Sequence, residues 1–371
     1  MRDRCRWGIL GTANIARKNW AAIRNSGNGI VTAVASRTPS RAEEYIRQLQ
    51  AECPFSQHPQ ACSYEELLRR KDVDAVYIPL PTGLRAGWVK EAARAGKHVL
   101  CEKPCALDAA ELREMLAACR DDRVQFMDGV MFMHSARLPA VRQVLEDGES
   151  IGTIKRIAGQ FSFLGEQDFL TGDIRMNSQL EPHGCLGDLG WYLIRFALWI
   201  MNGKMPREVS ARMLSQQGRG DSPASVPTEV AFDLLFDGGV SAGFYCSFLT
   251  ENQQFAHVSG TKGNLLLSDF VLPYVGNEAA FVVSNDRFHV AGSQFCMERR
   301  SRRIAVDEYA NNAPSAQESQ LFRTFSELVL SGSNNPYWPE IALQTQMVLD
   351  ACLESAHNNA RLVAVNQNAG F

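Results

Sequence analysis

The stretch Gly8-Ile9-Leu10-Gly11-Thr12-Ala13-Asn14-Ile15-Ala16 decides how the first part of this chain folds. It joins an apolar strand, Arg6 to Leu10, to a helical segment from Asn14 to Ser26. Gly11 allows the tight turn out of the strand, Ala13 lets the backbone approach a bound group closely, and Ala16 lets the helix pack on the sheet. Because helix N-termini attract anions, this Gly-x-Ala-x-x-Ala turn predicts binding of a dinucleotide pyrophosphate. The motif is degenerate, so an ordinary strand–helix turn is the alternative.

After this first pair, the pattern predicts further strands and helices in alternation. The expected strands are Ile30–Ser36, Ala75–Pro79, His98–Cys101 and Val124–Met127, and the expected helices are Ser40–Glu52, Leu84–Ala95 and Asp108–Cys119. Asp108 is a good N-cap, and Glu111 stands where a capping box needs an acid. Such alternation is typical of a parallel, doubly wound sheet. We therefore predict an α/β Rossmann domain over residues 1–129.

Beyond residue 130 strand-like segments follow one another with few helices between them. They are Ile154–Phe163, Glu208–Met213, Glu229–Leu235, Val240–Ser247, Phe255–Gly260, Asn264–Ser268 and Ile304–Val306. Asp237-Gly238-Gly239 is a strong hairpin signal between two of them, and the Gly/Ser/Pro-rich residues 216–227 predict a mobile surface loop. Helices are expected at about Leu186–Met201 and Glu340–Asn358. Residues 130–371 are thus predicted to form an α+β domain with a large, open, mostly antiparallel sheet.

The composition excludes several classes of protein. Of the 371 residues, 45% are hydrophobic and 21% are charged, the ordinary balance of a soluble globular protein. The net charge of −3 provides no basic surface for nucleic acid or a membrane. The 10 cysteines include no Cys-x-x-Cys pair, which predicts free, buried thiols of a reducing compartment and no metal site. We see no secretion signal or membrane-spanning stretch, and we predict a cytoplasmic protein that acts on a small molecule.

The end of the second predicted strand indicates which nicotinamide cofactor binds. Folds that prefer NAD usually carry Asp or Glu about 20 residues past the glycines, where the acid binds the ribose 2′-hydroxyl. Here the strand ends in Ala35-Ser36-Arg37-Thr38, and no acid occurs before Glu43. Ser36 can hydrogen-bond a 2′-phosphate, and Arg37 can pair with it. We expect NADP(H) in preference to NAD, the alternative being that Arg37 is simply a solvated loop charge.

Two polar segments are expected where the strands end. The strand His98–Cys101 leads into Glu102-Lys103-Pro104, at the carboxyl edge where ligands bind in doubly wound sheets. Gly187-Asp188-Leu189-Gly190-Trp191-Tyr192 opens the apolar helix, and its spacing places Asp188 and Tyr192 on one helical face. Lysine between an acid and a proline has few structural uses there, whereas Asp188 could be only an N-cap and Tyr192 only a core residue.

These segments, with Ala75-Val76-Tyr77-Ile78-Pro79-Leu80-Pro81-Thr82 and Gly96-Lys97-His98-Val99-Leu100-Cys101, resemble the Gfo/Idh/MocA family of oxidoreductases over nearly the whole chain. The resemblance implies that a Rossmann domain precedes an open-sheet domain, which binds the substrate and forms the subunit interface. Together with Ser36 and Arg37 from the end of the second strand, the residues expected to bind the cofactor are Gly11, Thr12, Ala13, Asn14, Ile15, Pro79, Leu80, Pro81, Thr82, Glu102, Lys103 and Pro104.

The resemblance also implies roles near the reaction. Lys103 matches the active-site lysine, Pro104 a proline whose peptide bond is often cis, and Asp188 the acid at the start of the helix. Many members have histidine at the position of Tyr192, and the tyrosine here is similar to the branch with glucose–fructose oxidoreductase and the dimeric dihydrodiol dehydrogenase. The chain departs from the family at Thr82-Gly83-Leu84-Arg85, where relatives often have Asn-x-x-His, and this leaves the role of Arg85 open.

The chemistry of the residues supports the same roles. Hydride transfer to a ketone leaves an alkoxide that needs a proton, and oxidation of a carbinol must release one. The usual tyrosine pKa near 10 is high for this work at neutral pH, and a nearby ammonium would lower it by stabilising the phenolate. We therefore expect Tyr192 to exchange the proton, Lys103 to act as its electrostatic partner, and Asp188 to bind a substrate hydroxyl or orient the pair.

Four further polar residues are candidates for substrate contacts: His134, Asp173, Arg175 and His183. The two histidines either line the substrate cleft or are satisfied structural residues. Asp173 and Arg175 lie in the polar loop before the apolar helix and are weaker candidates for sugar contacts.

Taken together, the sequence predicts an NADP(H)-dependent oxidoreductase acting on a carbinol or ketone of a sugar, sugar derivative or cyclic diol. One alternative is a non-catalytic protein of the same fold that senses NADP, although retention of Lys103 and Tyr192 argues against it. Another is an enzyme that keeps NADP bound and shuttles hydride between two sugars. The family's usual interface predicts a homodimer or a dimer of dimers.

Overall fold

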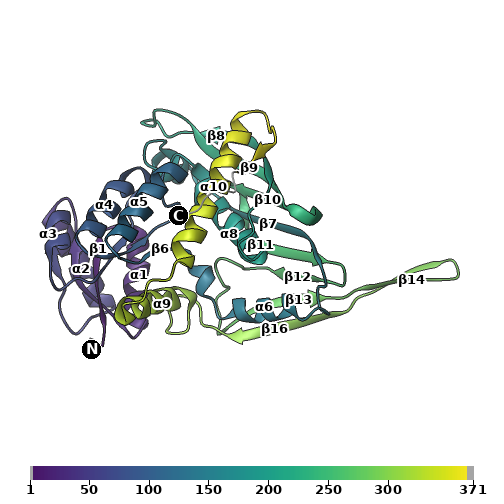
Figure 1. Ribbon diagram of the computed structural model, residues 1–371, viewed down its shortest axis with the longest axis horizontal. Helices are drawn as coiled ribbons and strands as arrows, with labels where there is room; N and C mark the ends of the chain where they lie inside the picture. Colours follow the sequence, from purple (N-terminus) through teal and green to yellow (C-terminus); the bar gives the residue numbers. More distant parts are fainter. Residues whose placement is uncertain (1–2, 366–371) are drawn as a thin grey trace.

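The computed structural model describes residues 3–365 (Figure 1). Its first sheet has six parallel strands in the order β3-β2-β1-β4-β5-β6. The strands are β1 (Cys5–Leu10), β2 (Gly29–Ala35), β3 (Gln60–Cys62), β4 (Ala75–Ile78), β5 (His98–Cys101) and β6 (Phe126–Asp128). The helices between them are α1 (Asn14–Asn25), α2 (Pro39–Glu52), α3 (Tyr64–Arg69), α4 (Thr82–Arg94) and α5 (Ala109–Asp121). The predicted Rossmann arrangement is confirmed.

Strand β3 and helix α3 were not predicted from the sequence. A strand as short as β3 shows no periodicity, and its place is decided by parallel pairing with β2. The start of α3 does carry a local signal, because Ser63 and Glu66 form a complete capping box. The box predicted at α5 forms only in part. Asp108 accepts a hydrogen bond from the Glu111 N–H at 2.8 Å, but the Glu111 carboxylate accepts from Leu107 instead.

The second sheet has nine strands in the order β16-β13-β12-β11-β7-β10-β9-β8-β17. Its neighbours are antiparallel except for β7 and β10, which are parallel. The strands are β7 (Ile154–Leu164), β8 (Glu208–Gln217), β9 (Val226–Leu235), β10 (Ser241–Ser247), β11 (Leu249–Gly260), β12 (Asn264–Leu267), β13 (Glu278–Ser284), β16 (Ser301–Asp307) and β17 (Val363–Ala364). The predicted open, mostly antiparallel sheet is confirmed, with β8 and β9 extending into the segment predicted as a loop.

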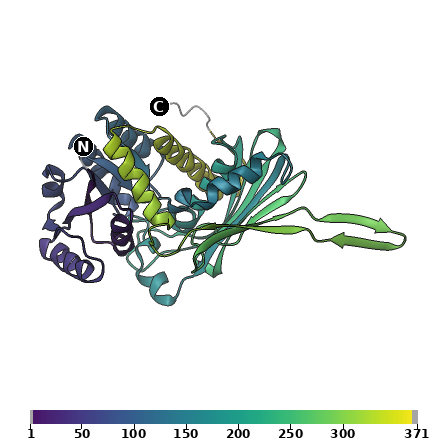
Figure 2. The same cartoon turned by 90° about the horizontal axis from the view of Figure 1, so that it is seen from below.

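Helices cover the inner face of this sheet, as the edge-on view in Figure 2 shows. They are α6 (Arg137–Glu146), α8 (Trp191–Ile200) and α10 (Tyr337–His357). The second half of the chain also contains α7 (Gln167–Gly172) and α9 (Gln317–Ser331), a π-helical turn at Leu186–Gly190 and 3-10 turns at Met131–His134, Ile174–Met176 and Asp237–Gly239. The turn at Asp237–Gly239 joins β9 to β10 as the predicted hairpin. In the described residues, no helix is both long and apolar enough to cross a membrane.

Helix α9 belongs to the second half of the sequence but packs against the first domain. The Trp7 ring of β1 lies 5.1 Å from that of Phe322 and 5.2 Å from that of Phe325, and its Nε1 donates to Ser326 Oγ at 3.1 Å. The sequence analysis assigned no helix here. This contact ties the two halves together, so the first core includes residues beyond the predicted boundary at 129/130.

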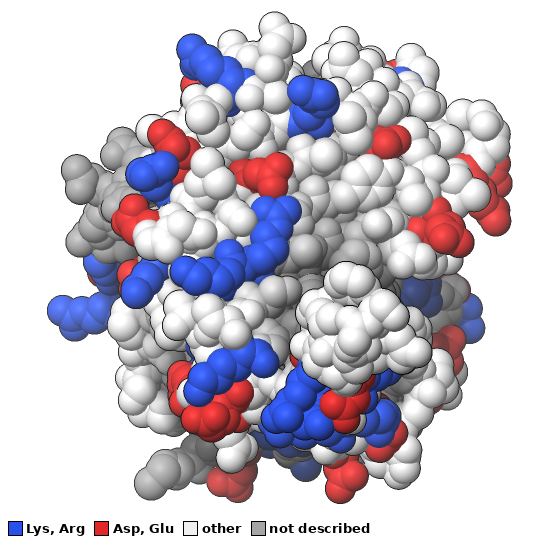
Figure 3. All heavy atoms as spheres, turned by 90° about the vertical axis from the view of Figure 1, so that its right-hand side faces the viewer, with Lys and Arg blue, Asp and Glu red and all other residues white. Residues whose placement is uncertain are grey.

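A two-stranded arm extends far from the rest of the molecule in both ribbon views (Figures 1 and 2). It consists of β14 (Arg287–Ala291) and β15 (Gln294–Glu298), which pair only with each other. Figure 3 looks at the molecule from the side of the arm and shows Lys and Arg interspersed with Asp and Glu over this face. The sequence analysis predicted neither strand of the arm nor β13.

Candidate active site

A cleft of about 1100 Å³ runs between the carboxyl end of the parallel sheet and the second domain. The first domain contributes the turn after β1 and the ends of β2, β4 and β5. The second domain contributes residues of β7, β11 and the segment that opens α8. The cleft thus collects most of the predicted cofactor and catalytic residues.

The turn after β1 is shaped for close approach of a ligand. Gly11 has a φ of 125°, which disfavours other residues, and an added Cβ would lie 3.0 Å from Leu80 Cδ2. Helix α1 begins after Ala13 with no side-chain cap and no acid in its first turn. Its first N–H groups therefore remain available to an anion. Gly11 and the predicted Thr12, Ala13, Asn14 and Ile15 all line the cleft, and this arrangement fits a dinucleotide.

Ser36 and Arg37 also line the cleft, at the end of β2. Ser36 is 4% exposed, whereas Arg37 is an exposed side chain. Arg41, in the first turn of α2, joins them in the cleft lining and was not among the predicted site residues. Arg41 follows Arg37 by four residues, and this spacing could have indicated that both arginines lie at the same end of the cleft. The two guanidinium groups supply positive charge at this end of the cleft.

The segment after β4 divides between the cleft and the core. Pro79, Leu80 and Pro81 line the cleft as predicted, but Thr82 is not among the lining residues. Thr82 is fully buried, and its hydroxyl donates to Glu181 Oε2 at 2.5 Å. The expected cofactor contact of Thr82 is therefore corrected to a structural one, because Glu181 already occupies its hydroxyl and its backbone N–H.

Arg85, whose role the sequence left open, donates hydrogen bonds to several backbone carbonyl groups. Its side chain is 4% exposed and donates to the carbonyls of Leu80 at 2.5 Å and Glu102 at 2.9 Å, and also to that of Pro104. Arg85 thereby joins the loop after β4 to the Glu102-Lys103-Pro104 turn. Its charge is used to hold the loops in place.

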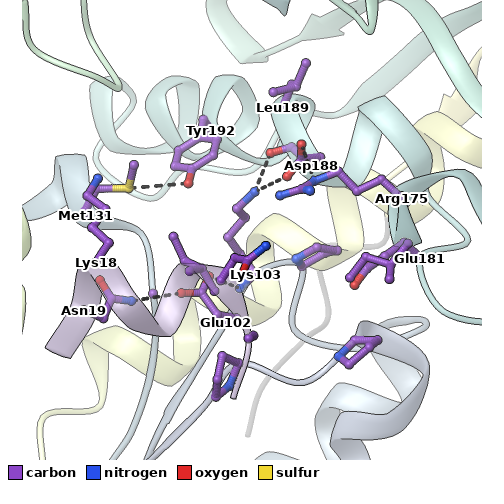
Figure 4. A pocket seen from close by; sticks show the side chains of 18 of the residues that line it. Lys18, Asn19, Glu102, Lys103, Met131, Arg175, Glu181, Asp188, Leu189 and Tyr192 are labelled. Atoms are coloured by element: carbon purple, nitrogen blue, oxygen red, sulfur yellow. Dashed lines mark hydrogen bonds and ion pairs between the residues drawn. The ribbon is translucent and has the colours of Figure 1, made fainter. Parts of the chain in front are cut away.

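Lys103 follows β5 and extends across the cleft to the second domain (Figure 4). Its Nζ donates to the backbone oxygen and to Oδ1 of Asp188, each at 2.7 Å. The peptide bond between Lys103 and Pro104 is cis. The Arg175 Nε lies 2.9 Å from Asp188 Oδ2, and Asp173 lies 3.2 Å from the Arg175 Nη1. The carboxylate of Asp188 is thus shared between two cations from different segments.

Charge and burial act in opposite directions on Asp188. Burial disfavours its ionised form, but Arg175 and Lys103 together hold the pKa of its carboxyl well below the usual range. The Asp188 charge in turn raises the pKa of Arg175. Asp188 lies inside the π-helical turn rather than at the N-cap of α8, which is Gly190. The structure therefore offers no support for reading Asp188 as an N-cap.

Tyr192 lies at the start of α8 with its ring beneath the Lys103 ammonium, 4.7 Å from the ring centroid (Figure 4). Its hydroxyl donates to Met131 Sδ at 3.4 Å. Burial, and then the charges of Glu102 and Asp188, raise the pKa of Tyr192 well above its usual value. The predicted net lowering of this pKa is wrong, because burial and the two carboxylates outweigh any stabilisation of the phenolate by the Lys103 ammonium, which pairs with Asp188.

Glu102 is held by partners that the sequence analysis did not single out. Its Oε1 accepts from the Tyr77 hydroxyl at 2.5 Å and from Asn19 Nδ2 at 3.5 Å. Its Oε2 accepts from the backbone N–H of Lys103 at 3.3 Å. All four residues line the cleft. Since Tyr77 and Asn19 come from β4 and α1, only the assembled sheet shows that they support the turn carrying Lys103.

The two predicted histidines lie outside the cleft lining. His134 stacks on Trp338 with ring centroids 4.8 Å apart, and burial lowers its pKa to about 3. His183 Nε2 lies 2.9 Å from the carbonyl oxygen of Leu107, and burial lowers its pKa to about 4. His183 is buried and His134 is half-buried against Trp338, and neither lines the cleft, so the structure does not place them for the expected substrate contacts. Asp173 and Arg175 do line the cleft.

The wall opposite the Rossmann domain combines aromatic and amide side chains. Phe161 and Phe163 come from β7, and Asn252 and Gln253 come from β11. The pairing of β7 and β11 is irregular between Leu249 and Gln253, so β11 bulges where it meets the cleft. The sequence predicted both strands without indicating which residues face the cleft, since that depends on the bulge.

Comparison with known proteins places the chain among oxidoreductases. Residues 5–130 match the model of an oxidoreductase family with an NAD-binding Rossmann fold, and residues 139–266 match the GFO/IDH/MocA C-terminal domain. The chain is 29% identical to dTDP-3,4-didehydro-2,6-dideoxy-alpha-D-glucose 3-reductase of Actinomadura kijaniata, over 95% of this chain and 96% of the relative. It is 32% identical to trans-1,2-dihydrobenzene-1,2-diol dehydrogenase of Mus musculus, over 70% of this chain and 74% of the relative.

Among solved structures, the chain is similar to KijD10, a 3-ketoreductase from Actinomadura kijaniata in complex with NADP and TDP-benzene. The TM-score is 0.78 at 27% sequence identity, covering 95% of this chain and 98% of the other. Both domains and their order agree with the predicted family. The chain therefore belongs to the GFO/IDH/MocA family of oxidoreductases.

Proposed function

We propose that this chain interconverts a carbinol and a ketone on a sugar, sugar derivative or cyclic diol, with Tyr192 exchanging the proton and NADP(H) as the cofactor. The observation that carries the proposal is the convergence in the cleft of Lys103, from the first domain, with Asp188 and Tyr192, from the second. Relatives that act on sugars and diols, and the NADP held by KijD10, support the same choice.

The chain's own groups supply the proton chemistry, while bound NADP(H) would donate or accept the hydride. In the reducing direction the Tyr192 phenol donates its proton to the alkoxide that develops on the substrate. Its raised pKa keeps the phenol protonated at neutral pH, as a donor requires. Lys103 would stabilise the phenolate that remains after transfer, because its ammonium already lies over the ring. Asp188 holds that ammonium in place, and Arg175 in turn pairs with the Asp188 carboxylate.

A non-catalytic NADP sensor is the competing function. Such a protein would need the dinucleotide turn, the Ser36 hydroxyl and the charges of Arg37 and Arg41, but it has no use for Lys103 and Tyr192. The ion pair between Lys103 and Asp188 joins the two domains at the cleft, where a sensor would gain nothing from a buried phenol beside it. We therefore favour the enzyme, whether or not it releases NADP in each cycle.

The experiment that tests this function is a screen of sugars, inositols and diols for NADP-linked absorbance change, together with fluorescence titration of the protein with NADPH and NADH. We expect NADPH to bind at micromolar concentrations and at least one class of polyol to give turnover. Absence of binding by either nucleotide contradicts the cofactor assignment. Tight NADPH binding with no turnover on any polyol or on its ketone supports the sensor instead.

Replacing Arg37 by alanine is expected to weaken NADPH binding by about tenfold to a hundredfold, because a charge-assisted hydrogen bond is worth roughly 1.5–3 kcal/mol. Affinity for NADH should change little, since NADH lacks the 2′-phosphate. Titration with both nucleotides measures the ratio. Arg69→Ala, on an exposed helix outside the cleft lining, serves as the control. An equal loss for both nucleotides means that Arg37 does not recognise the 2′-phosphate.

The raised pKa of Tyr192 predicts different pH profiles for the two directions. A phenol whose pKa lies well above 10 stays protonated between about pH 6 and pH 9. We expect kcat for ketone reduction to be nearly flat there, and kcat for alcohol oxidation to rise about tenfold per pH unit, since the base form becomes more abundant. Profiles at saturating cofactor measure both. Loss of reduction above about pH 7 would indicate a Tyr192 pKa that is lowered rather than raised.

We also propose that the outer face of the nine-stranded sheet forms a homodimer or dimer-of-dimers interface. Along β7, β11 and β12 this face carries side chains that are half-buried or exposed, among them Gln160, Phe255 and Leu266. A mixed face with apolar members is typical of subunit contacts.

A further inference from the structure

One face of the arm formed by β14 and β15 is apolar and exposed to water. Phe288 pairs with Met297 across the two strands, and Val290 pairs with Phe295. Because alternate residues of a strand share a face, these four side chains lie together. They are 58%, 71%, 56% and 78% exposed, in that order. We name them the arm face.

The arm face is unusual for a strand pair that stands alone. An isolated two-stranded ribbon is marginally stable in water, and exposed strands are normally protected by charged residues. Here residues 288–297 contain no Lys, Arg, Asp or Glu. Grouped apolar side chains on a soluble protein mark a surface that another surface covers.

The arm continues the large sheet without a change of register. Ser284 of β13 pairs with Ser301 of β16, and Arg287 pairs with Glu298 farther out. Between these pairs the Asn285 N–H donates to the carbonyl of Arg300 at 2.8 Å. The strands therefore gain no extra residue between the sheet and the arm, so the alternation of faces is preserved.

This alternation shows which face of the sheet the arm face extends. Phe281 and Val283 of β13 are buried on the inner face, which the helices cover. Ala280 and Val282 point to the opposite, outer face and are half-buried. Phe288 and Val290 follow in the same alternation as Ala280 and Val282. The arm face thus prolongs the outer face of the nine-stranded sheet.

From this continuity we propose that the arm is a clasp for a second copy of this chain. When two sheets pack by their outer faces about a two-fold axis, each arm passes over the partner subunit, and its apolar side chains become buried there. Because the two-fold interface uses the same surface on both subunits, each arm contacts the partner's outer face and requires no additional binding site.

The surroundings of the arm favour a protein partner over a lipid surface. Past Ser284 and Asp286 the arm face continues into the mixed outer face of the sheet, which carries Val282, Phe255 and Leu266, whereas a membrane would contact only the projecting end. The arginines at the base are in part neutralised within the chain, since Arg300 pairs with Glu298 at 2.9 Å and Arg303 pairs with Glu278.

The test compares two variants with four threonine substitutions each. The face variant carries F288T, V290T, F295T and M297T, and the matched control carries H289T, A291T, Q294T and C296T on the opposite face. Sedimentation velocity over a range of concentrations measures the dimer dissociation constant. We expect at least a tenfold increase for the face variant, because buried aromatic side chains carry much of the energy of an interface, and little change for the control.

A third variant, in which Asn-Gly replaces residues 287–298, keeps the result interpretable if the face variant folds poorly. It removes the whole arm and joins the strands by a favoured two-residue turn, and it is expected to weaken the dimer to the same extent or more. A monomeric wild-type protein, or a dissociation constant unchanged in both the face variant and the arm deletion, overturns the proposal. Monomeric protein that sediments with phosphatidylglycerol vesicles assigns the arm to membranes and also overturns it. NADPH titration of every variant separates this result from the proposed chemistry, since the arm contributes no residue to the cleft.

Discussion

Replacement of Lys103 by methionine is expected to lower kcat about a thousandfold, which corresponds to ~4 kcal/mol of transition-state stabilisation. The lysine supplies the positive charge over the Tyr192 ring, at a centroid distance of 4.7 Å, where a phenolate forms during ketone reduction. Methionine has a similar length and no charge, so the variant removes the electrostatic contribution while filling much of the same space. Stopped-flow single turnover with NADPH and a ketone substrate isolates the chemical step.

The interpretation of the Lys103 variant requires that the site remains folded. Asp188 retains Arg175 as a partner at 2.9 Å, so its carboxylate is not left alone in the cleft. Lys90→Met is the matched control, since Lys90 forms an ion pair with Glu114 at 3.0 Å outside the cleft lining. The control should retain wild-type kcat and thermal stability. A Lys103 variant whose single-turnover rate falls less than about tenfold contradicts the electrostatic role.

Replacement of Tyr192 by phenylalanine is expected to lower kcat by about a hundredfold to ten-thousandfold, the usual contribution of a positioned proton donor. NADPH affinity should remain nearly unchanged, because the substitution removes one hydroxyl whose partner is Met131 Sδ at 3.4 Å. The ring that packs against Phe132 and Phe161 stays in place. Steady-state kinetics and NADPH titration of the same preparation separate the two effects.

Tyr45→Phe is a suitable control for the Tyr192 variant. Tyr45 is also a buried tyrosine, but it lies on α2 outside the cleft lining. It should leave kcat unchanged. If Tyr192→Phe retains wild-type turnover and the same pH profile for alcohol oxidation, the proton comes from another group, and the assignment of Tyr192 is wrong.

Features that depend only on residues close together in the sequence could be predicted without the structure. The Gly11 turn, the strand before Glu102-Lys103-Pro104 and the alternation of strands and helices are local patterns. Such patterns can be recognised in the sequence without knowing how distant segments pack. They were enough to predict the Rossmann domain, the open sheet, the family and the residues of the dinucleotide turn.

Short or isolated elements could not be predicted in the same way. Strand β3 pairs over only a few residues and shows no periodicity. The arm strands do alternate apolar residues, but they are only 5 residues long, and nothing local shows that they pair with each other outside the large sheet. Helix α9 is amphipathic, but only the folded chain shows that its apolar side packs on Trp7 in the other domain.

The tertiary structure alone decided what the site residues do to one another. Lys103 and Asp188 are 85 positions apart in sequence, and nothing local shows that the ammonium pairs with the carboxylate and lies over the ring of Tyr192. The pKa of a phenol depends on burial and on the placement of charges, which is why the expected lowering became a rise. His134 and His183 lie outside the cleft for the same reason, since the position of a side chain follows from packing and not from residue type.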